Sequence, residues 1–127
     1  MTSTVHNVTV DARNAYEQAA WWSKVLGLTV SEEDNPGDPE CLVLLPSGIQ
    51  YLFIEVPESK SVKNRMHLCL QPTDATRDEE VERLLTIGAK IYDDQRRPDG
   101  TGWVTMHDPE GNEFCVERSA AERAATS

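Results

Sequence analysis

The second half of the chain repeats the first half at an offset of 60 to 63 residues. Each half opens with an alternating segment and continues into an amphipathic run. A proline-containing turn follows before a further alternating segment, and it reads LPSG at residues 45–48 and DPEG at residues 108–111. A unit that recurs within one chain predicts two copies of one supersecondary structure, and such copies commonly enclose a small-molecule cleft.

Each copy has the pattern of one strand, one helix and three further strands. Capping boxes at Asn14 and Glu17, and at Thr76 and Glu79, mark the two helix starts, and Gly27 is expected to end the first helix. The sequence therefore predicts an α+β fold in which two tandem βαβββ modules form one curved, eight-stranded mixed sheet around a cleft. The expected strands are 5–12, 28–30, 41–45, 51–56, 66–71, 89–94, 102–107 and 113–118.

The length of 127 residues fits a single domain, 1–127. Module one is expected at about residues 4–58, module two at about 65–119, and a tail at 120–127. The polar, aperiodic segment 58–64 is the expected linker.

Charge and composition exclude several classes of partner. The chain has 12 basic and 22 acidic residues and a net charge of −10, so it lacks the clustered basic footprint that nucleic acid requires. No apolar stretch approaches the length of a membrane span. Three cysteines without a secretory signal favour a reducing, cytoplasmic location.

Several segments resemble the vicinal oxygen chelate superfamily, which includes glyoxalase I, extradiol dioxygenases and bleomycin-resistance proteins. These segments are LG at 26–27, VPE at 56–58, KNRMHL at 63–68 and DPEGNEFCV at 108–116. The similarity extends from about residue 5 to residue 119 and is greatest to the bacterial glyoxalase-like branch. It implies paired βαβββ modules, a homodimer and, in enzymatic members, a divalent metal chelated by His and Glu that polarises vicinal oxygens of the substrate.

The residues at the family's ligand positions form a poor hard-metal site. The resemblance places Asn7 on the first strand, His67 at the start of the second module and Cys115, where many members carry Glu, on the last strand. An amide and a thiol suit Mg²⁺, Mn²⁺ or Ni²⁺ poorly. The remaining position falls on Leu52 or Ile54, and neither binds metal.

Glu55 would reach the cavity only if a bulge rotated its strand. We therefore favour no metal and expect no cofactor. A divalent metal held by His67, Glu55 and Cys115 is the alternative.

A softer site is a further interpretation. Strand alternation places His67, Cys69 and Gln71 on one face, and Cys115 lies on a strand that is expected to face them. These two thiols and the imidazole are suitable ligands for Zn²⁺. No Cys-x-x-Cys pair is present, however, so we expect inert thiols that line the cavity.

Two aromatic residues of module two are candidates for the cleft. Trp103 is expected either to stack on a planar ligand or to pack in the core. His107 precedes the 108–111 turn and is expected to be structural, with a general base as the alternative.

Two functional hypotheses remain open, and whether the chain is an enzyme is undecided. The favoured one is a glyoxalase-like protein that binds a small organic molecule without the usual metal, as resistance-type members bind drugs. The alternative is a metal-dependent lyase, isomerase or dioxygenase of glyoxalase type that uses His67. The expected ligand-binding residues are Asn7, Leu52, Ile54, His67, Cys69, Trp103 and Cys115.

Overall fold

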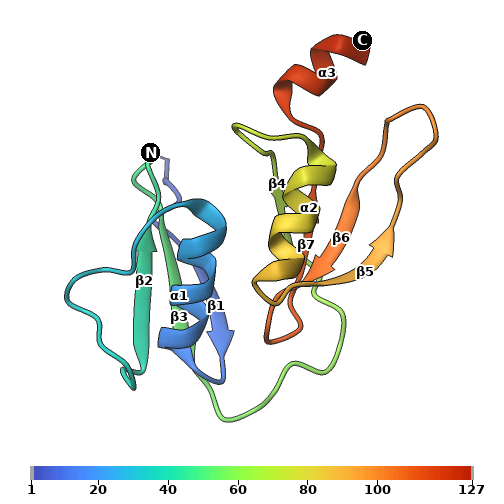
Figure 1. Cartoon of the computed structure of the whole chain (residues 1–127). Helices are drawn as coiled ribbons and strands as arrows, with labels where there is room; N and C mark the ends of the chain where they lie inside the picture. The colour runs from blue at the N-terminus through green and yellow to red at the C-terminus, as the bar shows by residue number, and fades with distance from the viewer. Residues whose placement is uncertain (1, 127) are drawn as a thin grey trace. The chain divides into compact units, whose positions relative to one another are not determined.

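The computed structural model describes residues 2–126 and divides into two compact units (Figure 1). Unit 1 is Met1–Ser59 and unit 2 is Lys60–Ser127, so the boundary falls inside the expected linker. Ser127, the last residue of the expected tail, lies outside the described residues, as does Met1.

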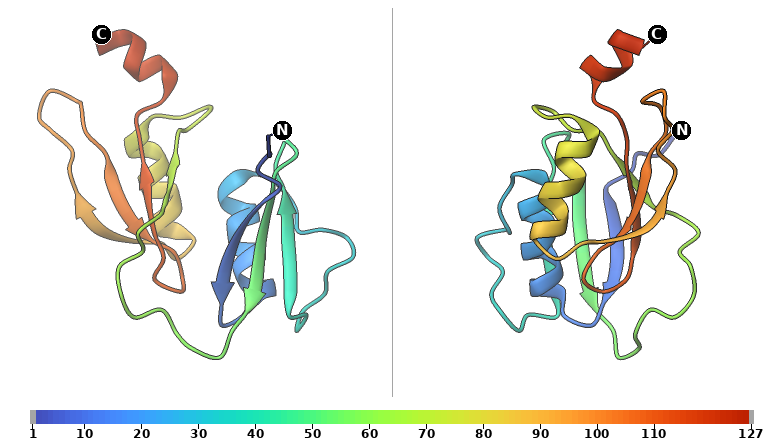
Figure 2. Two further views of the ribbon diagram at one scale, coloured as in Figure 1. Left: turned by 180° about the vertical axis from the view of Figure 1, so that it is seen from behind. Right: turned by 45° about the vertical axis from the view of Figure 1, so that its right-hand side comes forward.

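Unit 1 is a mixed three-stranded sheet with a helix on one face (Figures 1 and 2). The strand order is β1-β3-β2, with β1 parallel and β2 antiparallel to β3. The helix buries Trp22 against the sheet, where its ring meets that of Tyr51 edge-on at 5.4 Å between centroids. The elements are β1 (Asn7–Ala12), α1 (Ala15–Leu26), β2 (Glu40–Leu44) and β3 (Gln50–Glu55).

Unit 2 contains a four-stranded mixed sheet in the order β4-β7-β6-β5, again with one helix, α2, on one face (Figure 2). Strand β4 runs parallel to β7, and the other pairs are antiparallel. The core beneath α2 is fully buried and apolar, with Leu84 and Val81 from the helix and Phe114 and Met106 from the sheet. The elements are β4 (Leu68–Leu70), α2 (Arg77–Thr86), β5 (Lys90–Asp94), β6 (Val104–His107), β7 (Glu113–Val116) and α3 (Ala120–Thr126).

Local capping explains where the helices begin and end. The Asn14 side chain accepts a hydrogen bond from the backbone N–H of Glu17, and Gly27 closes α1 at φ 67°, a conformation that favours glycine. Thr76 and Glu79 form the complete capping box of α2, as the sequence predicts. Within residues 2–126, no helix combines the length and the apolar character needed to cross a membrane.

The α+β class is confirmed, but the expectation of one eight-stranded sheet is wrong. The described residues form seven strands in two separate sheets. Of the expected strand 28–30, only a single antiparallel bridge between Val30 and Val43 is present. The Ser31 N–H still donates a hydrogen bond to the Leu42 carbonyl oxygen at 3.0 Å, and the chain then leaves the sheet through the polar turns that follow, up to residue 38.

Candidate functional site

A pocket of about 740 Å³ lies on unit 2. Strand alternation places it on the sheet face opposite α2, since Cys115 and Thr105 line it while their neighbours Phe114 and Val104 are in the core. Its lining combines thiols, aromatic rings and charges of both signs. The residues are Lys63, His67, Cys69, Tyr92, Asp93, Arg97, Thr101, Gly102, Trp103, Thr105, Glu113, Cys115, Glu117, Arg118 and Arg123.

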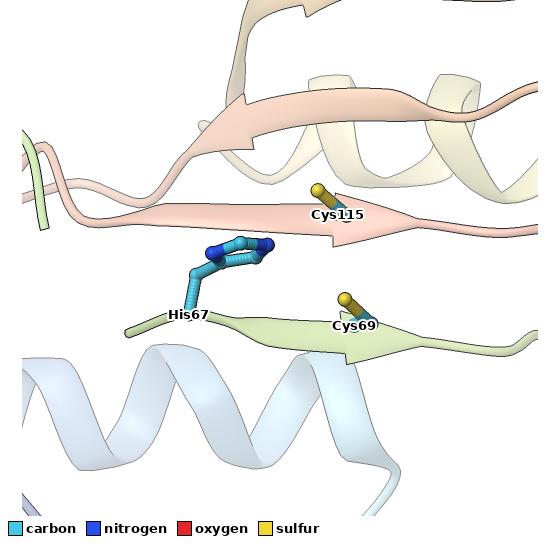
Figure 3. A group of neighbouring side chains, drawn as sticks. All are labelled: His67, Cys69 and Cys115. Atoms are coloured by element: carbon cyan, nitrogen blue, oxygen red, sulfur yellow. The ribbon is translucent and has the colours of Figure 1, made fainter. Parts of the chain in front are cut away.

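Three potential metal ligands converge in this pocket (Figure 3). Cys69 of β4 and Cys115 of β7 are direct partners in the parallel register, and His67 shares their face two residues before Cys69. One ligand atom from each of the three residues lies within 4.8 Å of the other two. The structure therefore brings together the three residues of the softer site that the sequence suggests.

The two thiols differ in their surroundings. Cys115 is 7% exposed, and its Sγ lies 3.3 Å from the Oγ1 of Thr105, its neighbour on β6. Cys69 is exposed at the pocket surface. Partial burial of its sulfur, together with the nearby Cys115 and Glu117, raises the pKa of the Cys69 thiol.

Trp103 and Arg97 form one wall of the pocket. Trp103 is 38% exposed, and the guanidinium carbon of Arg97 lies 5.8 Å from the centroid of its ring, within cation–π range. On β5, Tyr92 stacks on His107 with centroids 4.4 Å apart. Because Trp103 lines the pocket and is partly exposed, its aromatic side chain is open in part to a ligand.

Arg77 holds the loop that carries this wall, a role that the sequence analysis missed. Arg77 is 4% exposed, and its Nη1 donates hydrogen bonds to the carbonyl oxygens of Gly100, Thr101 and Gly102 at 3.3, 3.0 and 3.0 Å. At Gly102, φ is +94° and an added Cβ would lie 2.0 Å from the carbonyl oxygen of Gln95. Only the position of Arg77 as the first residue of a capped helix was visible in the sequence.

Glu113 is a second residue that the sequence analysis gave no role. Its carboxylate is buried and accepts hydrogen bonds from Lys60 Nζ and from the Asn64 backbone N–H, each at 3.0 Å. The Nε2 atom of His107 lies 3.8 Å away. Burial tends to raise the pKa of Glu113, but these hydrogen bonds outweigh it and hold the pKa below its usual value. One signal in the sequence could have found Glu113: strand alternation places residues 113, 115 and 117 on one face, the face that Cys115 contributes to the pocket.

The other expected site residues lie in unit 1. Asn7 pairs with Gln50 in the parallel register, so its side chain lies on the same face of the sheet as those of Leu52 and Ile54. Tyr51, which alternates with them on β3, contacts Trp22 of α1, so this shared face is the one opposite α1. The Oδ1 atom of Asn7 is buried and has no hydrogen-bond partner among the described residues. The register of β3 against β1 is regular through Glu55, so Glu55 keeps the parity of Tyr51 and Phe53 and is exposed.

This arrangement does not fit the hard divalent metal that the family resemblance implies. Leu52 and Ile54 offer no ligand atom, and no bulge rotates Glu55 towards their face. In the part of the chain that the structure describes, the ligand group that forms around His67 and Cys115 contains Cys69 in place of Glu55. Two sulfurs and one imidazole are a soft donor set.

Comparison with known proteins gives one family and many similar folds. A family model of the glyoxalase-like domain matches residues 7–117. No curated protein matches the sequence.

Three solved structures illustrate the similarity. A variant of the fosfomycin resistance protein FosX from Listeria monocytogenes, complexed with Mn(II) and 1S,2S-dihydroxypropylphosphonic acid, is 18% identical with a TM-score of 0.70, over 97% of this chain and 94% of that one. Lactoylglutathione lyase from Agrobacterium tumefaciens is 18% identical with a TM-score of 0.62, over 94% and 95%. A glyoxalase/bleomycin resistance protein/dioxygenase family enzyme from Burkholderia phytofirmans is 15% identical with a TM-score of 0.67, over 90% and 97%. At these identities the likeness concerns the fold.

Proposed function

The chain belongs to the glyoxalase-like family of the vicinal oxygen chelate superfamily, and we propose that it binds a small organic molecule in the pocket of unit 2 without the family's hard metal centre. The observation that carries the proposal is the pocket itself. Its volume of about 740 Å³ lies within the range of small-molecule sites. The partly exposed ring of Trp103 supplies a flat contact surface in it.

The charges around the ring favour a planar molecule with an acidic group. Lys63 and Arg97 both line the pocket, and the hydrogen bonds of their cationic groups among the described residues go to the uncharged oxygens of Asn64 and Thr101. Neither cation forms a close ion pair with a carboxylate in this part of the chain, although the charge of Arg97, after the hydrogen bonds from Thr101, contributes to the lowered pKa of Asp99. An aromatic anion would stack on Trp103 and pair with Lys63 or Arg97.

The test uses 8-anilinonaphthalene-1-sulfonate, a planar aromatic anion, in a fluorescence titration. Trp103→Ala removes the stacking surface, and we expect it to weaken binding about tenfold, the equivalent of about 1.4 kcal/mol. Leu85→Ala is the matched control, because Leu85 on α2 is 37% exposed, close to the 38% of Trp103, and does not line the pocket. Equal affinity in wild type and Trp103→Ala would contradict the proposal.

A metal-dependent lyase, isomerase or dioxygenase is the second candidate, favoured by the convergence of His67 with Cys115. The two functions separate when the titration is repeated after treatment with EDTA. Binding as proposed persists without metal, whereas a site that holds its ligand through a metal ion would lose binding when the metal is removed. The part of Asn7, Leu52 and Ile54 in ligand binding stays a prediction, and so does the homodimer that the resemblance implies.

A further inference from the structure

We propose that His67, Cys69 and Cys115 form a binding site for a thiophilic divalent cation, with Zn²⁺ as the expected ion. The site goes beyond the proposed binding of an organic molecule. It shares the positions of His67 and Cys115 with the hard-metal centre that the family resemblance implies, but its third ligand is Cys69, so that two of the three ligands are thiols and all three come from unit 2.

The backbone places the three side chains side by side. Cys69 and Cys115 are direct partners on adjacent parallel strands, which lie about 4.8 Å apart in any sheet. His67 precedes the first residue of β4, so its position on the shared face is set by the strand while its ring is exposed and can reorient. Figure 3 shows the imidazole beside the two thiols.

The distances suit a tetrahedral ion after a small adjustment. Two ligand atoms about 2.3 Å from a tetrahedral zinc lie about 3.8 Å apart. The three ligand atoms are within 4.8 Å of one another, so closure requires movements of about 1 Å or less, which side-chain rotation provides. The strands need not move, and Phe114 and Val116 on either side of Cys115 are fully buried.

The donor set selects the class of ion. Two thiolates and one imidazole favour Zn²⁺ over Mg²⁺, Ca²⁺ or Mn²⁺, which prefer oxygen. The acidic side chains on the same strand face are already engaged, since Glu113 bonds to Lys60 and Glu117 pairs with Arg123 at 3.2 Å. Three protein ligands leave the fourth position of a tetrahedral ion open to the pocket.

Thr105 completes the site from the next strand. Its hydroxyl lies 3.3 Å from the Cys115 sulfur and is placed to donate a hydrogen bond to the thiolate once a metal is bound. Such partners orient the ligand and typically contribute about 10- to 100-fold to metal affinity.

The experiment is a Co²⁺ titration of the full chain, stripped with EDTA and kept reduced with a phosphine. We expect one Co²⁺ per chain, a thiolate-to-cobalt charge-transfer absorption, and displacement by Zn²⁺. Cys69→Ala should reduce this absorption by about half and weaken binding at least tenfold. His67→Gln should weaken binding while both thiolate contributions remain. Both residues are exposed, so these variants are expected to fold.

Cys41→Ala is the matched control. Cys41 is fully buried on β2 in unit 1, where burial and the nearby Asp34 and Asp38 raise its pKa to about 11, and its loss should leave the titration unchanged. Absence of thiolate absorption in reduced wild type at saturating Co²⁺, or the same spectrum in Cys69→Ala, would overturn the inference. The fluorescence titration on EDTA-treated protein tests the organic ligand separately, so either proposal can fail alone.

Discussion

Arg77 shows how one side chain fixes the geometry of the pocket rim. A guanidinium group has five donors in a rigid fork, and here one nitrogen meets three consecutive backbone carbonyls while Nε bonds Asp78 at 3.0 Å. The rim loop 100–102 contributes no apolar core of its own. Its conformation therefore depends on a residue that lies outside the loop.

Arg77→Met should destabilise the protein by about 2 to 4 kcal/mol, because three carbonyls lose a charged donor. We expect faster hydrogen exchange at the Gln95 and Arg97 amides, which bond across this loop to Trp103 and Thr101. Arg77→Lys keeps the charge but cannot span the same acceptors, so it should recover less than half of the loss. Chemical denaturation and exchange mass spectrometry measure both effects. A Met variant with wild-type stability would contradict this account.

At the scale of elements, one carboxylate joins the starts of two helices. Ser119 and Glu122 form a capping box for α3, with the Ser119 N–H donating to Glu122 Oε1 at 2.9 Å and the Glu122 N–H donating to Ser119 Oγ at 3.1 Å. The same Oε1 accepts the Arg77 N–H, at the first residue of α2, at 2.6 Å. The expected tail is thus a helix tied to the body of unit 2.

This contact should depend on pH. Burial tends to raise the pKa of Glu122, but the hydrogen bonds from Ser119 and Arg77 lower it overall. A depressed folded pKa contributes stability above the ordinary value of about 4.3, and that stability is lost as pH falls through the folded value. Glu122→Ala should therefore cost about 1 kcal/mol at pH 7 and less below about pH 4.

Thermal unfolding across this pH range provides the measurement. Glu82→Ala is the control, because Glu82 is an exposed side chain on α2, and it should change stability by less than about 0.5 kcal/mol. A Glu122→Ala deficit that did not shrink in acid would show that charge plays no part in the contact.

At the scale of the whole molecule, the repeat is visible in the topology of both units. In each sheet the first strand pairs in parallel with the last, and the last pairs antiparallel with the one before it. The bridge at Val30 occupies the place that β5 takes in unit 2. The two copies have diverged in length at one edge while keeping the same strand order.

The proposed cation site belongs to one copy, so its effect should be local. With Zn²⁺ bound, we expect slower hydrogen exchange in β4 and β7, because the ion ties these strands together. Exchange in β1, β2 and β3 should be unchanged. The full chain is labelled with and without Zn²⁺ and then digested, and mass spectrometry of the peptides reports exchange in each sheet separately. Equal protection of the two units would argue against a site confined to unit 2.

The sequence predicts the repeated elements and the His67–Cys69 face, because caps and strand alternation are local properties. It does not predict the sheet count, since the short segment 28–30 gains only one bridge before the polar loop turns away. It also misses the roles of Arg77 and Glu113. The backbone partners of Arg77 lie 23 to 25 residues away in the sequence, and the partners of Glu113 lie 49 to 53 residues away. Long-range partners of this kind leave no periodic signal in a single chain.

The hydrogen bonds of Arg77 to the rim loop also have a consequence for how the pocket can evolve. Carbonyl oxygens are common to all amino acids, so the hydrogen bond from Arg77 to position 101 does not depend on which side chain that position carries. Selection is then free to exchange the side chain at position 101 without loss of this support, whereas positions 100 and 102, at φ +90° and +94°, favour glycine. New preferences for ligands would arise there at little cost to folding.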